Sequence, residues 1–147
     1  MNRAGVVALA VTCLSLSACV VPARNDAVYR TDASMALESA DSETRTAQLA
    51  LEQWLDGQLT GPYANVVVTD SEGALGPIQT SFGGMDPSSR AVDELRDDVL
   101  QQLSDAEDAL AAARIALRRN DRAGVKVAAS TLDSVAKKLE ESGKRVS

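Results

Sequence analysis

The chain has 147 residues, and its 15 Lys and Arg against 21 Asp and Glu give a formal charge of −6 at neutral pH. This charge balance excludes a basic nucleic-acid-binding domain, because binding to phosphates requires an excess of cationic side chains. Histidine is absent, which excludes catalysis or metal binding by imidazole. The hydrophobic share of 45% is typical of a globular protein, and the length is sufficient for one domain.

The first eighteen residues have the pattern of an export signal. Arg3 supplies the only positive charge, and an uncharged apolar run of fifteen residues, from Ala4 to Ala18, follows it. This run is shorter than the roughly 20 residues that span a bilayer, and it is typical of a signal peptide. We therefore expect residues 1–18 to be removed from the mature protein.

The apolar run ends in the sequence Leu16-Ser17-Ala18-Cys19. This sequence resembles the lipobox of bacterial lipoproteins, in which an aliphatic residue and two small residues precede a cysteine. The resemblance implies that the chain is cleaved before Cys19 and that the Cys19 thiol carries diacylglycerol with chains such as palmitate. It further implies an extracytoplasmic protein of the bacterial cell envelope, bound to a membrane through its N-terminal lipid.

Two neighbouring features refine this expectation. Cys13 lies within the removed segment and Cys19 would carry lipid, so the mature chain would contain neither a thiol nor a disulfide. In lipoproteins of Gram-negative bacteria, Asp after the cysteine is the familiar signal for retention in the inner membrane. Val20 occupies that position here. The resemblance therefore favours the periplasmic face of the outer membrane if the host has one, and the cell membrane otherwise.

Residues 19–31 are predicted to be a tether, since they contain Pro22 and little periodicity. A first helix is predicted over 32–56, where Asp32 provides an N-cap and Gly57 ends the helix in the left-handed conformation. The apolar residues of this segment recur at helical spacing. They are Ala36, Ala40, Ala47, Leu51, Trp54 and Leu55.

Residues 58–87 change in character, because glycine and proline interrupt any helical pattern. These residues are Gly61, Pro62, Gly73, Gly76, Pro77, Gly83, Gly84 and Pro87. The β-branched segment 64–69 and the segment 78–82 are compatible with two short strands joined by a turn at 70–73. We therefore expect a Gly/Pro-rich loop or a short β-hairpin between the first and second helices.

A second helix is predicted over 88–119 and a third over 121–142, separated by the break at Asn120-Asp121. The apolar stripe of the second helix has steps of three and four residues. It consists of Val92, Leu95, Val99, Leu103, Ala106, Leu110, Ala113 and Leu117. The short connection predicts an antiparallel αα-hairpin, and the first helix would complete a small three-helix bundle in a mainly α protein.

Basic side chains gather around the predicted turn between the second and third helices. They are Arg114, Arg118, Arg119, Arg122 and Lys126. One interpretation is that they complement the helix dipole and keep the surface soluble. The other is a contact site for an anionic partner, such as lipid headgroups, a cell-wall polymer or an acidic protein surface.

Three aromatic residues, Trp54, Tyr63 and Phe82, lie in or beside the segment 58–87. They are interpreted either as cover for the ends of the helical core or as ligand-facing residues of a pocket near this segment. The second interpretation would make the protein a small ligand-binding lipoprotein.

No catalytic or cofactor-binding motif is complete. Ser134 and Lys137 have the spacing of serine enzymes that react with penicillin, but the chain lacks the accompanying K-T-G and S-D-N motifs. The carboxylates between 93 and 108 are spread around one helix and do not converge as cation ligands do, so we expect no metal site. We therefore expect no cofactor and no enzymatic activity. The sequence favours a lipid-anchored interaction or accessory module with an envelope protein as its partner.

Overall fold

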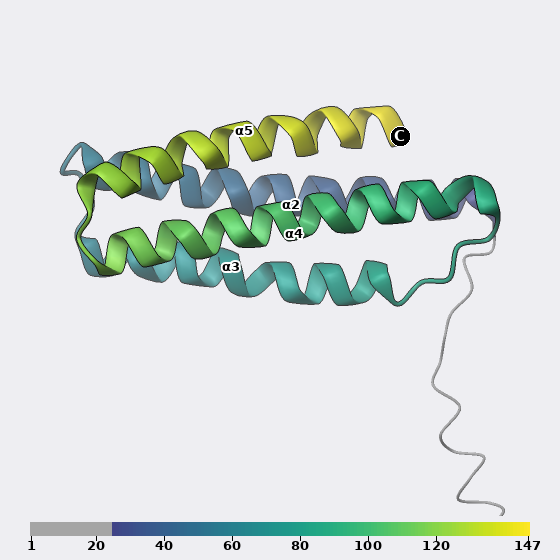
Figure 1. Cartoon of the computed structure of the whole chain (residues 1–147), viewed down its shortest axis with the longest axis horizontal. Coiled ribbons are helices and arrows are strands. Elements are labelled where there is room, and N and C mark those ends of the chain that lie inside the picture. The colour runs from purple at the N-terminus through teal and green to yellow at the C-terminus, as the bar shows by residue number, and fades with distance from the viewer. Residues whose placement is uncertain (1–24) are drawn as a thin grey trace, which may run out of the picture.

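A computed structural model describes residues 25–147, and these residues form a bundle of long helices (Figure 1). The elements, in chain order, are α2 (Asp26–Leu55), α3 (Gly61–Gly83), the short 3₁₀ helix η1 (Arg90–Val92), α4 (Asp93–Arg118) and α5 (Arg122–Val146). No strand occurs among residues 25–147. The prediction of a mainly α protein is confirmed, but the described chain has four long helices rather than three.

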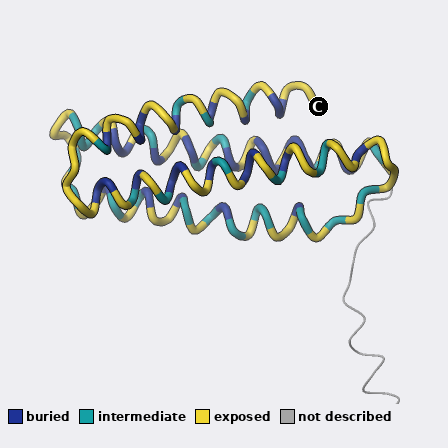
Figure 2. The backbone as a smooth tube through the Cα atoms, in the orientation of Figure 1, coloured by how far each residue is buried: buried dark blue, intermediate teal, exposed yellow. Residues whose placement is uncertain are grey.

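The four helices run up and down in alternation, and each is antiparallel to its neighbours in the chain (Figure 1). Helix α2 contacts α3, α4 and α5, while α4 contacts α3 and α5 as well. Helices α3 and α5 do not touch and lie at opposite edges of the bundle. The buried positions of all four helices face the interior (Figure 2).

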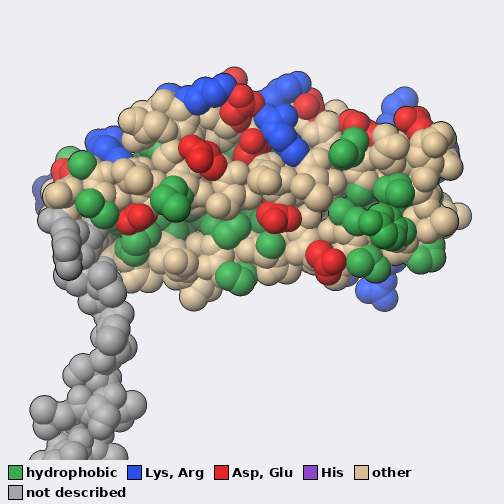
Figure 3. Space-filling view, turned by 180° about the vertical axis from the view of Figure 1, so that it is seen from behind, with side chains coloured by type: hydrophobic (Ala, Val, Ile, Leu, Met, Phe, Trp, Pro, Cys, Tyr) green, Lys and Arg blue, Asp and Glu red, His purple; other side chains and the backbone are tan. Residues whose placement is uncertain are grey.

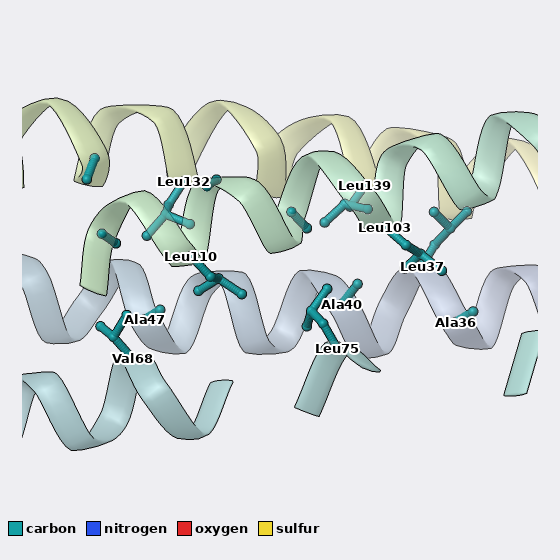
Figure 4. Packing of buried hydrophobic residues seen from close by; sticks show 14 of the residues in the cluster. Ala36, Leu37, Ala40, Ala47, Val68, Leu75, Leu103, Leu110, Leu132 and Leu139 are labelled. Atoms are coloured by element: carbon teal, nitrogen blue, oxygen red, sulfur yellow. The ribbon is translucent and has the colours of Figure 1, made fainter. Parts of the chain in front are cut away.

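The core is built from leucine and alanine. Leu110 and Leu103 of α4 and Leu132 and Leu139 of α5 lie in the core between the helices, and all four side chains are buried (Figure 4). Helix α2 presents fully buried alanines on the same seam, including Ala40 and Ala47, so that the neighbouring helices approach it closely. Each fully buried leucine contributes about 1.5–3 kcal/mol relative to an exposed one.

The predicted loop or β-hairpin over 58–87 is wrong, because most of this segment is the helix α3. Its buried residues recur at helical spacing and are Ala64, Val68, Ser71, Leu75 and Phe82. Figure 4 shows Val68 and Leu75 pointing into the core toward α2. Burial of this stripe between α2 and α4 outweighs the β propensity of the three consecutive valines 66–68.

Glycine and proline are tolerated in α3 for identifiable reasons. Pro62 lies in the first turn, where its missing N–H has no intrahelical partner to lose. Pro77 lies inside the helix and removes the hydrogen bond that the Gly73 carbonyl would accept. Gly73 and Gly76 each cost about 1 kcal/mol relative to alanine. Tertiary packing therefore holds a helix that local propensity disfavours.

The remaining boundaries differ less from expectation. Helix α2 begins at Asp26 instead of residue 32, because the Asn25 side chain accepts a hydrogen bond from the Val28 N–H at 2.9 Å and caps the helix. Residues 26–31 of the predicted tether are thus helical and Asn25 is their cap, while residues 19–24 of that tether lie outside the described residues. Gly57 has the expected left-handed conformation, with φ of +73°, and Asn120 at the predicted break is also left-handed, with φ of +52°.

Candidate functional site

One end of the bundle contains the start of the described chain and the connection from α3 to α4. The Asp26 carboxylate accepts hydrogen bonds from the hydroxyls of Ser88 and Ser89, and these bonds lower the pKa of Asp26. Next to it the rings of Tyr29 and Phe82 lie 5.4 Å apart, both buried. Burial raises the pKa of the Tyr29 phenol. These contacts join the N-terminal end of α2 to the connection that follows α3.

The structure separates the three aromatic residues that the sequence places near one another. Phe82 packs in the core at this end, whereas Trp54 is half-buried at the opposite end of the bundle. Tyr63 is 59% exposed and lies 19 residues before Phe82 in the same helix, which corresponds to about 28 Å. The three rings therefore do not line one pocket.

Two members of the basic group have structural partners. The Arg114 guanidinium makes a bidentate ion pair with the Glu72 carboxylate and so joins α4 to α3. The hydrogen bond to Glu72 raises the pKa of Arg114. Arg122 lies over the Trp54 ring, 5.7 Å from its centroid, and donates to the Leu55 carbonyl. Both arginines thus hold helix ends and neighbouring helices together.

The other basic residues, Arg118, Arg119 and Lys126, are exposed and form no ion pair with any residue between 25 and 147. Arg119 borders a groove between α4 and α5. Arg118 borders a groove between α3 and α4. The structure therefore divides the basic group into two anchoring arginines and three side chains that are available to a partner.

The groove between α3 and α4 is open and has a volume of about 590 Å³. Glu107 and Arg118 of α4 border it, and Gly73 and Gly76 of α3 form part of its other wall. A Cβ atom added at either glycine would meet no atom within 4 Å. The fold itself therefore does not require glycine at these two positions.

A second groove, between α2 and α3, is apolar and has a volume of about 350 Å³. Met35, Ile78, Phe82 and Met85 contribute to its lining, and Met35 is 60% exposed. Hydrophobic side chains gather over α2 and α3 on this side of the molecule, whereas Lys and Arg follow the edge formed by α5 (Figure 3).

The outward surface of α3 carries almost no charge. Seven exposed residues form a continuous stripe along this helix, which we name the α3 outer face. They are Pro62, Val66, Thr69, Asp70, Gly73, Pro77 and Thr80. Asp70 is the one ionisable member, and Tyr63 and Val66, which are 59% and 53% exposed, add apolar surface. Sequence reasoning took residues 66–82 as a loop free to carry recognition and so did not define a helical face, although no Lys or Arg occurs anywhere between residues 46 and 89.

The residues with a serine-enzyme spacing have other partners. Ser134 donates to the Ser130 carbonyl at 3.0 Å, and Lys137 pairs with Asp133 at 2.6 Å. Within residues 25–147 no group of three or more acidic or cysteine side chains is arranged to hold a metal ion. None of the helices in this same range combines the length and apolar character needed to cross a bilayer.

No family model, curated protein or solved structure matches this chain. Cys19 and residues 1–18 lie outside the described residues, so the lipidation of Cys19 stays a prediction.

Proposed function

We propose that this protein is a lipid-anchored, non-enzymatic interaction or accessory module of the bacterial cell envelope, and that the α3 outer face is its recognition surface. The observation that carries the proposal is the exposure of this face. A helix on the surface of a water-soluble bundle ordinarily turns charged residues outward, and α3 turns Val66, Gly73 and Pro77 outward. Continuous surface of this kind is typical of a site that another molecule covers.

The apolar groove between α2 and α3 adjoins this face and extends it. Met35 and Ile78 lie on the two walls of the groove, and Tyr63 and Val66 continue the apolar surface toward the other end of α3. Of the seven large hydrophobic residues that are exposed among residues 25–147, five belong to α2 and α3. A partner that covers this side of the bundle would remove most of the exposed apolar surface from water.

Anchoring would place this surface at a membrane. Five residues lie between Cys19 and Asn25, so the connection has six residue-to-residue steps and a maximum reach of about 21 Å. The acyl chains contribute about 0.8 kcal/mol per buried CH₂ group, so two or three chains would hold the bundle stably. Confinement to the periplasmic face of the outer membrane, or to the cell membrane in a host without one, raises the effective concentration of a weakly binding envelope partner.

Arg118, Arg119 and Lys126 provide a second contact for an anionic group on the partner. Helix α2 has 30 residues and is therefore about 45 Å long. Since α4 ends and α5 begins at the end opposite to Asn25, these side chains lie roughly that distance from the start of the described chain. The proposal needs only these three residues, because Arg114 and Arg122 are engaged within the bundle.

The alternative function is ligand binding in the apolar groove between α2 and α3, whose volume of about 350 Å³ fits a small apolar molecule. The groove supports this alternative less well than it supports a protein contact. Trp54 and Tyr63 are absent from its lining, and the groove opens to solvent along its length.

The test is crosslinking in intact cells with a photoreactive amino acid at Val66. The matched control carries the same amino acid at Val127, which is 67% exposed on α5. We expect specific adducts from position 66, few from 127, and loss of the position 66 adducts when Cys19→Ala removes the anchor. Equal adducts from both positions would contradict the recognition surface. Absence of palmitate on the wild-type protein, measured by metabolic labelling, would contradict the anchor.

A further inference from the structure

We infer that the molecule covering the α3 outer face is a second copy of this chain, with the two α3 helices antiparallel about a two-fold axis at Gly73. The inference rests on the proposed function in one respect only, that α3 carries the recognition surface, and it does not depend on lipidation. Three features point to a second copy as the partner: the position of the glycines, the sizes of the side chains and the placement of the charges. Each of them is matched on the two sides of Gly73.

The first observation is the position of the glycines. Helix α3 spans 61–83, so Gly73 lies one residue from its centre, and it is exposed in the middle of the α3 outer face. Gly73 and Gly76 weaken the helix by about 1 kcal/mol each. Space at both positions is empty within the chain. Glycine at the crossing point of two helices allows their backbones to approach closely. Such a contact explains why α3 keeps two glycines that lower its stability and that its own fold does not require.

The second observation is the match in size. An antiparallel pair with its axis at Gly73 places each residue opposite the residue at the same distance on the other side of Gly73. Asp70, the one ionisable residue of the face, then lies over Gly76 of the second copy, where no side chain obstructs it. Val66 lies opposite Thr80, and Thr69 lies opposite Pro77. Each larger side chain thus meets a smaller or a compact one.

The third observation is the charge along the α4 side of the groove. Gly83 lies against Leu100, and Glu72 pairs with Arg114, so the antiparallel register places Gly73 level with residues 110–113 of α4. Glu107 and Arg118 both border the groove, on opposite sides of this level. Their midpoint falls between residues 112 and 113. Neither residue forms an ion pair with any residue between 25 and 147.

This arrangement is complementary to itself. The two-fold axis that makes the α3 helices antiparallel brings Arg118 of each copy to Glu107 of the other, which gives two equivalent ion pairs. An unrelated partner would not require the opposite charges to be equally spaced about Gly73. A dimer formed instead through the acidic first turns of α4 would place like charges against each other. Such a contact would be repulsive in a protein whose net charge is −6.

The available area is also sufficient. The 23 residues of α3 give a strip about 35 Å long. Together with the adjoining side of α4, a strip about 20 Å wide would bury on the order of 700 Å² per copy. Two copies then bury roughly 1,400 Å², which lies within the range of specific protein interfaces.

The test is a charge swap measured by sedimentation equilibrium. The processed full chain is purified in a detergent whose density matches the solvent, and its dissociation constant is compared with those of Glu107→Arg, Arg118→Glu and the double variant. Each single reversal turns two attractive contacts into two repulsive ones, so we expect dimerisation to weaken roughly tenfold. The double variant recreates both pairs with reversed polarity, and we expect it to regain most of the wild-type affinity.

Lys144→Glu is the matched control, because Lys144 is 71% exposed on α5, its pair with Glu140 is an exposed pair within that helix, and the substitution changes the net charge by the same amount as Arg118→Glu. It should leave the dimer unchanged, and circular dichroism should show equal helicity in all variants. A monomeric wild type, or single reversals without effect, would overturn the inference, as would a double variant weaker than both single variants. Adducts from position 66 to a different protein in cells, together with a monomeric wild type, would retain the proposed function and reject this inference alone.

Discussion

Helices α3 and α5 pack into the core in the same way, but their solvent-facing surfaces differ in charge. Both bury an apolar stripe against α2 and α4, and both occupy an edge of the bundle. Helix α5 carries nine charged side chains among 25 residues, whereas α3 carries two among 23. The comparison teaches that the inward stripe determines where a helix packs, while its outward residues indicate whether water or another molecule covers it.

The two helices also differ in how they are held. Helix α5 begins with a capped N-terminus, where the Asp121 side chain accepts from the Gly124 N–H at 3.0 Å, and Lys144 and Arg145 suit its last turn. Helix α3 has no side-chain cap and contains Pro77 and four exposed or half-buried glycines. Stability of α3 therefore depends on tertiary contacts, while α5 is favoured by local sequence as well.

The largest expected effect concerns Phe82, which tests whether α3 is held by its inward stripe. Phe82→Ala removes a buried ring that packs on Tyr29, and we expect a loss of about 3–5 kcal/mol in the free energy of unfolding by urea. Tyr63→Ala removes an exposed ring from the same helix and should change this free energy by less than about 0.5 kcal/mol. Similar losses for the two substitutions would contradict the orientation of α3.

A second prediction compares ion pairs on the two helices. The Arg114–Glu72 side chains are 26% and 21% exposed, whereas those of Lys137 and Asp133 are 64% and 36% exposed. We expect Glu72→Gln to lower the free energy of unfolding by about 1 kcal/mol, because the bidentate ion pair is partly buried. Asp133→Asn should cost less than about 0.5 kcal/mol. Thermal unfolding of the monomeric variants at low and high salt would measure the two losses of stability. A larger loss for Asp133→Asn than for Glu72→Gln would contradict the prediction.

A third prediction separates the stability of α3 from its contact with a partner. Gly76→Ala adds a methyl group to open space in a helix, so we expect the monomer to gain about 0.5–1 kcal/mol of stability. The same methyl group lies in the proposed interface and should weaken dimerisation. Gly57→Ala is the control, because its φ of +73° makes alanine unfavourable and the variant should be less stable. If Gly76→Ala destabilises the monomer, the fold itself requires this glycine.

The smallest expected effect is a dependence on pH at the connection between α3 and α4. Hydrogen bonds from Ser88 and Ser89 lower the pKa of Asp26 in the folded chain. The stabilisation is therefore present at neutral pH and is lost as the pH falls below the ordinary carboxyl range, about pH 4. We expect the Asp26 carboxyl resonance to titrate at a higher pH in the Ser88→Ala/Ser89→Ala variant. An unchanged titration would show that the two hydroxyls do not hold the charged form.

On the α5 side, hydrogen bonds from Gln101 and then Lys138 lower the pKa of Asp105, and Lys144 lowers the pKa of Glu140. The sign is the same as at Asp26, so acid should weaken both edges of the bundle together. Because these carboxylates lie at the surface, salt should reduce the effect.

The sequence predicted most of α4, α5 and their antiparallel hairpin, because an uninterrupted apolar period and a two-residue break agree with one another. The predicted start at residue 88 was wrong, since the α-helix begins at Asp93, after the 3₁₀ turn η1. The sequence did not predict α3, although residues 64, 68, 71, 75, 78 and 82 have helical spacing. Pro77 and four glycines in that segment favour a loop when read locally, and only burial against α2 and α4 reverses the preference. Local propensity therefore does not predict the helical conformation of α3, which tertiary packing determines.

The candidate site was predicted only in part. Charge alone placed Arg118 among the possible contacts for an anionic partner, which stays a prediction, but Arg114 and Arg122 could not be distinguished from it without their partners Glu72 and Leu55. Trp54, Tyr63 and Phe82 were grouped because the intervening segment was taken as compact, and an extended helix places Tyr63 and Phe82 far apart. The α3 outer face could be recognised only after α3 was known to be a helix.

In the proposed dimer two copies meet at Gly73, and disulfide trapping in the envelope of intact cells would detect this contact. Gly73→Cys places two thiols beside the proposed axis, within reach of a symmetric disulfide. We expect an oxidised dimer from this variant and none from the parent chain or from Val127→Cys on α5. Absence of the dimer at position 73, or an equal yield from position 127, would contradict it.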